Sequence, residues 1–341
     1  MQRFALFSIL SLMALLASCS RESSKYVVLD GFAQGSTYHI VYNIPDNNNQ
    51  DSVKAAIEGI FAKGFEDINN SISGYDSLSI LSRFNRNENP LLDSIFIEIY
   101  NFSMEFFEIS GGMVDVTSAP LFDLWGFGFT RKEKITQEKI DSVKRFTGRE
   151  MFTLRRSDAG CYLAKRDSRA KLNFNAIAPG YTADYFARKL TCAGVSDFMI
   201  EVGGEIYCKG KNPKGENWKV GIDNPVDGNY IPGNDLADIV ELTDKGIVTS
   251  GNYRKFYVED GKKYSHTIDP VSGCPVQHNL LSATVIAENA ILADAYATYF
   301  MVLGVEKAKE FLSTHPELEA RLMYSEGDEI KVLSINQTTI D

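Results

Sequence analysis

Hydrophobic positions recur at helical spacing along the first half of the chain and again near its end. Apolar residues fall three or four positions apart over 53–68, and the same spacing over 93–109 ends at a pair of glycines. This period is typical of an amphipathic helix. Weaker patterns predict helices over 136–146 and 181–193. A strongly apolar run predicts a buried helix over 290–303, followed by a shorter polar helix.

Extended segments dominate after residue 194. Alternating apolar and polar positions are typical of strands, and a hairpin is predicted over 255–268 with its turn at Asp260 and Gly261. The predicted strands cover 38–44, 198–202, 218–222, 239–242, 247–249 and 281–287, with two more closing the chain. The mixture predicts an α+β body with antiparallel sheets and packed helices, arranged in two interlocked lobes.

The first 25 residues have the pattern of a targeting segment. Arg3 precedes an apolar run over 4–16, which is shorter than the roughly 20 residues of a spanning helix. The run ends in Leu-Ala-Ser-Cys, which is similar to a bacterial lipobox. We therefore expect 1–18 to be a lipoprotein signal peptide, Cys19 to be acylated and 19–25 to be a tether. An ordinary signal peptide with a chance cysteine is the alternative.

Composition limits the classes of function that the remaining body, 26–341, can have. The chain has 341 residues, of which 44% are hydrophobic, so it can bury a large core. A net charge of -10 argues against nucleic acid as a partner. A bound divalent cation would still allow a polyanionic ligand. The cysteines Cys161, Cys192, Cys208 and Cys274 are too widely spaced for a metal cage, and their pattern leaves disulfides or free thiols open.

Polar clusters rich in glycine lie at the ends of several predicted elements. Gly35 and Tyr75 belong to two such clusters, for which a plain turn is the alternative. A third runs over 111–128 and contains Asp115, Thr117 and Trp125. The tryptophan ring suits a ligand wall and a protein core equally well.

Two further clusters are suited to phosphate. The segment 173–181 lies at the start of a predicted helix, where free N–H groups and the helix dipole attract anions. A well-capped helix start is the alternative, because Pro179 restrains the first turn. Gly203 and Gly204 follow a predicted strand and permit close approach of the backbone to a ligand.

The last clusters carry the residues best suited to chemistry. Thr249, Ser250 and Gly251 precede the hairpin that ends near His266, one of only four histidines in the chain. His266 is a candidate acid–base or phosphate-contacting group, with a structural histidine as the alternative. Asp294 and Thr298 lie one turn apart on the buried helix. A carboxylate and a hydroxyl on one helical face suit a hard cation such as Mg²⁺.

Taken in order, these clusters resemble the ApbE family of FAD:protein FMN transferases, over residues 35–304. The strongest matches are 115–128, 249–251, 266–275 and 293–298. The resemblance implies a T-fold-like α+β core with FAD between the lobes. It also implies Mg²⁺-dependent transfer of the FMN moiety of FAD to a threonine hydroxyl of a partner protein, with release of AMP.

The resemblance also implies roles for individual residues. Asp294, Thr298 and the carbonyl of Ala176 match the family's Mg²⁺ ligands, and His266 matches the histidine that assists proton removal. The implied FAD-binding residues are Gly35, Tyr75, Asp115, Thr117, Trp125, Glu201, Gly204, Thr249, Ser250 and Gly251. The chain departs from the family at Asn173, where aspartate is usual, and at Pro179, where lysine is common.

The family's acceptors imply a place for the protein and two alternative functions. Family partners are flavin-carrying subunits of membrane redox complexes, and many members are periplasmic lipoproteins. We therefore expect an exported protein that is anchored through Cys19 on the periplasmic face of a bacterial membrane. An FAD pyrophosphatase that yields FMN and AMP, or a non-catalytic FAD-binding lipoprotein, would use the same site.

Overall fold

A computed structural model describes residues 26–45, 49–128, 134–229 and 231–337. The predicted signal peptide, the tether and Cys19 lie outside these residues. Among the helices of the described part, none has both the length and the apolar character needed to cross a membrane.

An eight-stranded sheet runs through the centre of the molecule, and each neighbouring pair of strands is antiparallel. Its order is β1-β2-β5-β6-β9-β14-β15-β16. The strands are β1 (Tyr26–Ala33), β2 (Ser36–Asn43), β5 (Phe198–Val202), β6 (Glu205–Lys209), β9 (Lys245–Gly251), β14 (Leu280–Ala287), β15 (Glu319–Glu326) and β16 (Glu329–Ile335).

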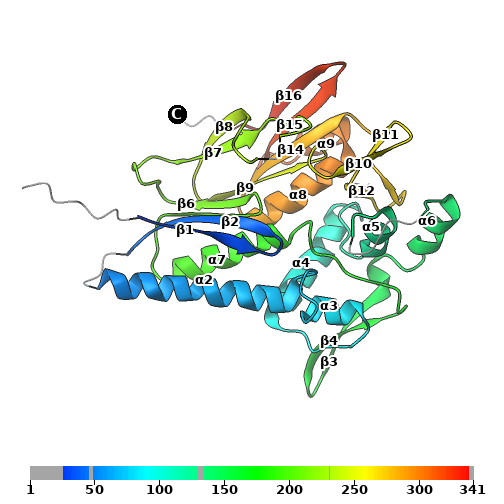
Figure 1. Cartoon of the computed structure of the whole chain (residues 1–341), viewed down its shortest axis with the longest axis horizontal. Coiled ribbons are helices and arrows are strands. Elements are labelled where there is room, and N and C mark those ends of the chain that lie inside the picture. Colours follow the sequence, from blue (N-terminus) through cyan, green and yellow to red (C-terminus); the bar gives the residue numbers. More distant parts are fainter. Residues whose placement is uncertain (1–25, 46–48, 129–133, 230, 338–341) are drawn as a thin grey trace, which may run out of the picture.

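Helices cover one face of this sheet and enclose the largest core (Figure 1). They are α2 (Gln50–Ile72), α4 (Ser94–Ile109), α7 (Ala178–Cys192), α8 (Ala290–Leu303) and α9 (Val305–Leu312). Phe61, Phe186 and Phe300 are among the fully buried side chains of this core. Helix α8 is apolar around most of its circumference because it lies between the sheet and the other helices.

The hairpin of β7 (Trp218–Asp223) and β8 (Leu236–Leu242) packs on the opposite face of the sheet. Trp218 and Val240 of the hairpin share a second core with Cys208 and Ile247 of the sheet. Covering both faces explains why strands β9 and β14 are buried along most of their length.

A third, smaller core lies beside the sheet and includes Leu121, Trp125, Ile140 and Ile268. It joins α5 (Ala119–Trp125) and α6 (Gln137–Lys144) to the hairpin of β10 (Phe256–Glu259) and β11 (Lys262–Ser265), with β12 (Ile268–Asp269) and β13 (Cys274–Pro275) next to them. The remaining elements are α3 (Ile80–Asn85), the 3-10 turn η1 (Arg149–Met151), and the hairpin of β3 (Phe152–Ser157) and β4 (Gly160–Lys165).

The α+β prediction is confirmed, and so are the predicted helices, the hairpin with its turn and most strand positions. The chain holds elements that the sequence pattern missed, namely β1, β6, β12, β13, α3, α5 and the β3–β4 hairpin. The strand predicted over 38–44 is therefore the second strand and not the first. Cys161, Cys192, Cys208 and Cys274 are all free thiols, which closes the disulfide alternative for these four residues.

Candidate active site

Helices α7 and α8 meet closely at the position of Asp294. The Gly180 N–H at the start of α7 donates a hydrogen bond to Asp294 Oδ2 over 3.2 Å. A Cβ on Gly180 would lie 2.6 Å from the carbonyl oxygen of Ala290 and 2.9 Å from the Asp294 Cβ. A glycine is therefore required for this approach, which places a buried carboxylate at the N-terminal end of α7.

A second acid of α7 fixes the start of α8. Asp184 accepts hydrogen bonds from the backbone N–H groups of Ala290 at 2.9 Å and Ile291 at 2.8 Å. Asn289 caps the same helix through the N–H of Leu292. Burial raises the pKa of Asp184 to about 6, although both of its oxygens have partners. The α8 helix is therefore held at a defined rotation and height against α7.

Glu205, at the start of β6, faces the same region and was not predicted from the sequence. Its Oε2 atom is shielded from solvent and has no hydrogen-bond partner among the described residues. Burial raises the pKa of Glu205 to about 7, and repulsion from Glu201 acts in the same direction. Burial also raises the pKa of Asp294 well above its usual range, and Glu205 is the largest of the charges that add to this shift. The carboxyl groups of Glu205 and Asp294 thus lie in one region, where the positive charge is too small to neutralise both of them.

The oxygen atoms around Asp294 suit a hard cation. Ala176 lies in the turn before α7, and Thr298 lies one turn beyond Asp294 on α8 with a partly exposed side chain. Across the described residues, no three or more His, Cys, Asp or Glu side chains form a group able to hold a metal. The predicted set differs from such a group because it combines one carboxylate with a hydroxyl and a backbone carbonyl, which are donors that Mg²⁺ accepts.

His266 follows the β10–β11 hairpin and presents an unpaired ring nitrogen. Its backbone N–H donates to the carbonyl of Lys255, and its ring contacts Phe127 edge-on at 6.4 Å between centroids. The Nδ1 atom is shielded from solvent and has no partner in the described structure. Burial, and to a smaller extent the nearby Lys255 ammonium, lower the pKa of His266 to about 4. The imidazole is therefore neutral at pH 7 and able to accept a proton.

The positive charge of Lys255 affects the pKa of His266 and that of an acidic residue near Asp294. Its charge acts on both His266 and Glu205. The Lys255 side chain is exposed, and no described residue forms an ion pair or hydrogen bond with its ammonium. The neighbouring Arg254, in contrast, is paired with Asp223 at 2.5 Å. The sequence prediction missed Lys255 because nothing in the local pattern distinguishes it from a solvated surface lysine.

The segment that precedes the hairpin is held by side-chain contacts. Thr249 Oγ1 and Thr284 Oγ1 of the neighbouring strand lie 2.8 Å apart. Ser250 is half-buried, and Gly251 packs so closely on Tyr253 that a Cβ would lie 2.7 Å from its ring. Thr249, Ser250 and Gly251 therefore sit on the last residues of β9, where the chain leaves the sheet toward His266.

Gly35 and Tyr75 are brought together although they are 40 positions apart in the sequence. A Cβ on Gly35 would lie 3.2 Å from the Tyr75 ring, and the positive φ of Gly35 favours glycine in its own right. Gln34 Nε2 donates to Thr182 Oγ1 of α7 at 2.9 Å, which holds this turn beside the start of that helix. Tyr75 is 59% exposed.

Glu201 and Gly204 lie on either side of the β5–β6 turn. Burial raises the pKa of Glu201, and the N–H of Gly204 lowers it through a hydrogen bond. The turn leads directly into Glu205. Glu201 pairs with Ile206 of the next strand, so its side chain is on the sheet face under the β7–β8 hairpin, opposite to that of Glu205. Gly203 and Gly204 both have positive φ, which a turn of this kind requires.

Three predicted residues have structural partners. Trp125 is buried in the third core and its Nε1 donates to the carbonyl of Gly273 at 2.8 Å, so the core alternative describes its ring. Thr117 is fully buried and accepts from the Gly148 N–H at 2.6 Å. Asp115 accepts from the Thr117 N–H at 2.8 Å, and burial raises its pKa to about 6. Their contacts hold the segment in place, and any contact with FAD would be additional.

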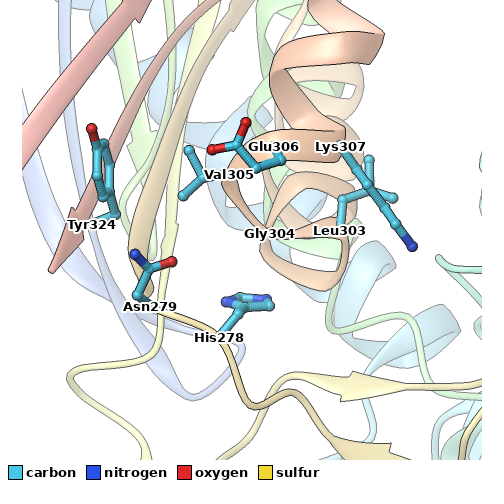
Figure 2. Close-up of a pocket in the computed structure, with 8 residues that line it drawn as sticks. All are labelled: His278, Asn279, Leu303, Gly304, Val305, Glu306, Lys307 and Tyr324. Atoms are coloured by element: carbon cyan, nitrogen blue, oxygen red, sulfur yellow. The ribbon is translucent and has the colours of Figure 1, made fainter. Parts of the chain in front are cut away.

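A surface cavity of about 270 Å³ lies at the opposite end of α8 (Figure 2). Its lining includes His278, Gly304 and Glu306 and none of the predicted site residues. His278 Nε2 is 2.9 Å from the carbonyl oxygen of Met301, which ties the imidazole to the end of the helix. The cavity is thus separate in sequence and lining from the residues around Asp294.

Comparison with known proteins extends these observations. The ApbE family model matches residues 34–322. The FAD:protein FMN transferase of Haemophilus influenzae is 33% identical over 304 residues, which cover 86% of this chain and 85% of that protein. That of Escherichia coli K12 is 35% identical over 295 residues, covering 82% of each.

Solved structures give the same result. The flavin transferase ApbE from Vibrio cholerae covers 91% of this chain and 97% of its own, with a TM-score of 0.77 and 29% identity. The flavinyl transferase ApbE of Pseudomonas stutzeri, in its apo form, has a TM-score of 0.77 and 31% identity over 91% of this chain and 95% of its own. Fold and relatives together define a transferase enzyme. The chain belongs to the ApbE family.

Proposed function

We propose that this enzyme transfers the FMN moiety of FAD to a threonine hydroxyl of a partner flavoprotein, with release of AMP, in a Mg²⁺-dependent reaction. The observation that carries the proposal is the buried Asp294 at the junction of α7 and α8, in a region of uncompensated negative charge. A cation there would meet a diphosphate at the N-terminal end of α7. The similarity to FAD:protein FMN transferases supports the substrate and the protein acceptor.

The reaction needs an oriented nucleophile and neutralised phosphate charge. The threonine oxygen forms a bond to the phosphorus of the FMN half, and the bond from that phosphorus to the bridging oxygen of AMP breaks. Mg²⁺ bound by Asp294, Thr298 and the Ala176 carbonyl would supply Lewis-acid stabilisation of the diphosphate. His266 would accept the threonine proton at its unpaired Nδ1, a contribution of about 10² to 10⁴ in rate.

Lys255 is the proposed cationic contact to the phosphates. Pro179 has no charge, so the start of α7 offers only backbone N–H groups there. Lys255 has no ion-pair partner among the described residues and acts electrostatically on both His266 and Glu205. Its position therefore supports a role in binding an anionic substrate between these groups.

The direct test is to incubate the purified enzyme with FAD, Mg²⁺ and a flavoprotein acceptor domain and to measure the intact mass of the acceptor. We expect a gain of one FMN, which is lost when the acceptor threonine is replaced by alanine. Free FMN with an unmodified acceptor would support the pyrophosphatase alternative instead. Intact FAD under all conditions would support the non-catalytic binding protein.

We further propose that the enzyme is exported and anchored through Cys19 on the periplasmic face of a bacterial membrane. The lipobox-like segment that ends at Cys19 supports this. In cells fed a labelled fatty acid, the wild-type chain should carry the label and sediment with membranes. Cys19→Ala should do neither. Equal labelling of the two proteins would rule out Cys19 as the acylated residue.

A further inference from the structure

Glu205 differs from the buried Asp184 beside α8 because one of its carboxylate oxygens is shielded from solvent and has no partner in the part of the chain that the structure describes. Both oxygens of Asp184 accept backbone hydrogen bonds at the start of that helix. The Oε2 atom of Glu205 is equally shielded but accepts none in the described structure. Buried polar atoms without a partner are rare and costly, so each requires a physical explanation.

The direction of the Glu205 side chain follows from the register of β6. Residues alternate between the two faces of a strand. Cys208 and Ile206 belong to the core under the β7–β8 hairpin, whereas Tyr207 packs on the core under the helices. Glu205 shares the face of Tyr207, which is the face covered by α7 and α8. The negative charge of Glu205 also raises the pKa of Asp294 on α8, as expected if both side chains lie on this face.

Protein cations do not supply the missing partner. Arg254 is the partner of Asp223, and the exposed Lys255 makes no hydrogen bond to Glu205 in the described structure. A second carboxylate is thus held near Asp294 at a cost in stability, because the charges of Lys255 and Arg254 lower its pKa without supplying a hydrogen-bond partner for Oε2. A bound cation would compensate both carboxylates at once.

We propose that Glu205 is a positioning residue of the cation site, with its unpaired Oε2 atom supporting from the sheet the same cation that Asp294 holds from α8. This inference rests on the proposed function and adds to it a residue from a third element. The site would then join β6, α7 and α8, so that the cation also fixes the helix pair against the sheet. A second carboxylate favours a divalent over a monovalent ion.

The test compares Mn²⁺ binding by calorimetry in FAD-free wild-type, Glu205→Gln and Glu241→Gln proteins. Glu241 is an exposed control of the same type on β8, paired with Lys219 at 3.2 Å. We expect Glu205→Gln to raise the Kd for Mn²⁺ about 10- to 100-fold, as supporting residues of metal sites do. Glu241→Gln should leave the Kd unchanged.

Melting temperatures without metal provide an independent second measurement. Removal of an uncompensated charge should leave the melting temperature of metal-free Glu205→Gln equal to or above that of the wild type. A lower melting temperature, or a failure to fold, would identify Glu205 as a structural acid and overturn the proposal. An unchanged Kd for Mn²⁺ would also overturn it.

A further variant separates this inference from the proposed function. If Asp294→Asn loses Mn²⁺ binding while Glu205→Gln keeps it, the inference about Glu205 fails and the proposed cation site at Asp294 stands. A wild-type protein that binds no Mn²⁺ would also remove the metal from the proposed function.

Discussion

The charge of Lys255 contributes to the low pKa of its neighbour His266. The imidazole is buried, and the ammonium of Lys255 adds to the effect of burial in disfavouring its protonated form. A histidine with so low a pKa stays neutral over the whole physiological range and can accept a proton there, although it is a weaker base than an ordinary imidazole. The same ammonium is available to an anionic substrate, so its two roles are coupled.

Replacing Lys255 by glutamine should raise the pKa of His266 from about 4 toward the ordinary value of 6.5. The sign follows because a positive neighbour disfavours imidazolium, and its removal stabilises the charged form. Titration of the His266 ring by NMR in the FAD-free protein measures this directly. The transfer assay should also show a higher KM for FAD.

Lys262→Gln is the matched control, because Lys262 belongs to the same hairpin and lies over the Tyr264 ring at 5.3 Å. It should leave both the pKa of His266 and the KM for FAD unchanged. An unchanged His266 pKa in Lys255→Gln would show that burial alone depresses it.

At the residue scale, the sequence predicts groups whose spacing is itself informative. Asp294 and Thr298 lie one helical turn apart, so their common face follows from the pattern. Glu205 follows a glycine pair at the start of a strand, a position where an exposed acid is ordinary. Its importance arises only from the helices that cross over it, and no local pattern encodes that crossing.

At the scale of elements, the contact between α7 and α8 determines where Asp294 lies. Gly180 permits the contact, and Asp184 and Asn289 fix the start of α8. The buried α8 and the long α2 could be predicted because their periodic patterns are long. Helices α3 and α5 were missed because six or seven residues hold too few turns to show a period. Strand β1 was missed because it lies at the edge of the sheet, where its exposed positions include the apolar Val28 and Phe32 and hide the alternation.

Gly180→Ala should destabilise the protein by about 1–3 kcal/mol, because the added methyl group overlaps the Ala290 carbonyl and Asp294. Chemical denaturation measures this change. Because the overlap moves Asp294, we expect weaker Mn²⁺ binding as well.

Gly59→Ala on α2 is the control, since an added Cβ there meets no atom within 4 Å. It should stabilise the protein by about 0.5–1 kcal/mol through helix propensity and leave metal binding unchanged. Equal stability of the two variants would show that the α7–α8 contact relaxes without cost.

At the scale of the whole molecule, the site joins parts that are remote in sequence. Ala176 precedes α7, Asp294 lies on α8, Glu205 opens a central strand, and His266 follows a hairpin beside the third core. Only the packing of helices on the sheet, and of the third core beside it, brings these segments together. That arrangement follows from long-range contacts. The sequence therefore suggests the proposed ligands only through the family resemblance, and the fold shows which residues lie around them.

Binding at such a junction should stabilise the whole fold. A ligand that binds only the folded state stabilises it by mass action, by about 2.7 kcal/mol at a concentration about a hundredfold above its Kd. Mg²⁺ should therefore raise the melting temperature of the enzyme, and FAD with Mg²⁺ should raise it further because the phosphates would add ligands to the cation.

Two variants test where the cation binds. Asp294→Asn should lose the increase in melting temperature that depends on Mg²⁺. Asp184→Asn should melt lower under every condition, because it weakens the cap of α8, yet keep that increment. Scanning calorimetry with and without each ligand separates the two variants, and an undiminished Mg²⁺ increment in Asp294→Asn would place the cation elsewhere.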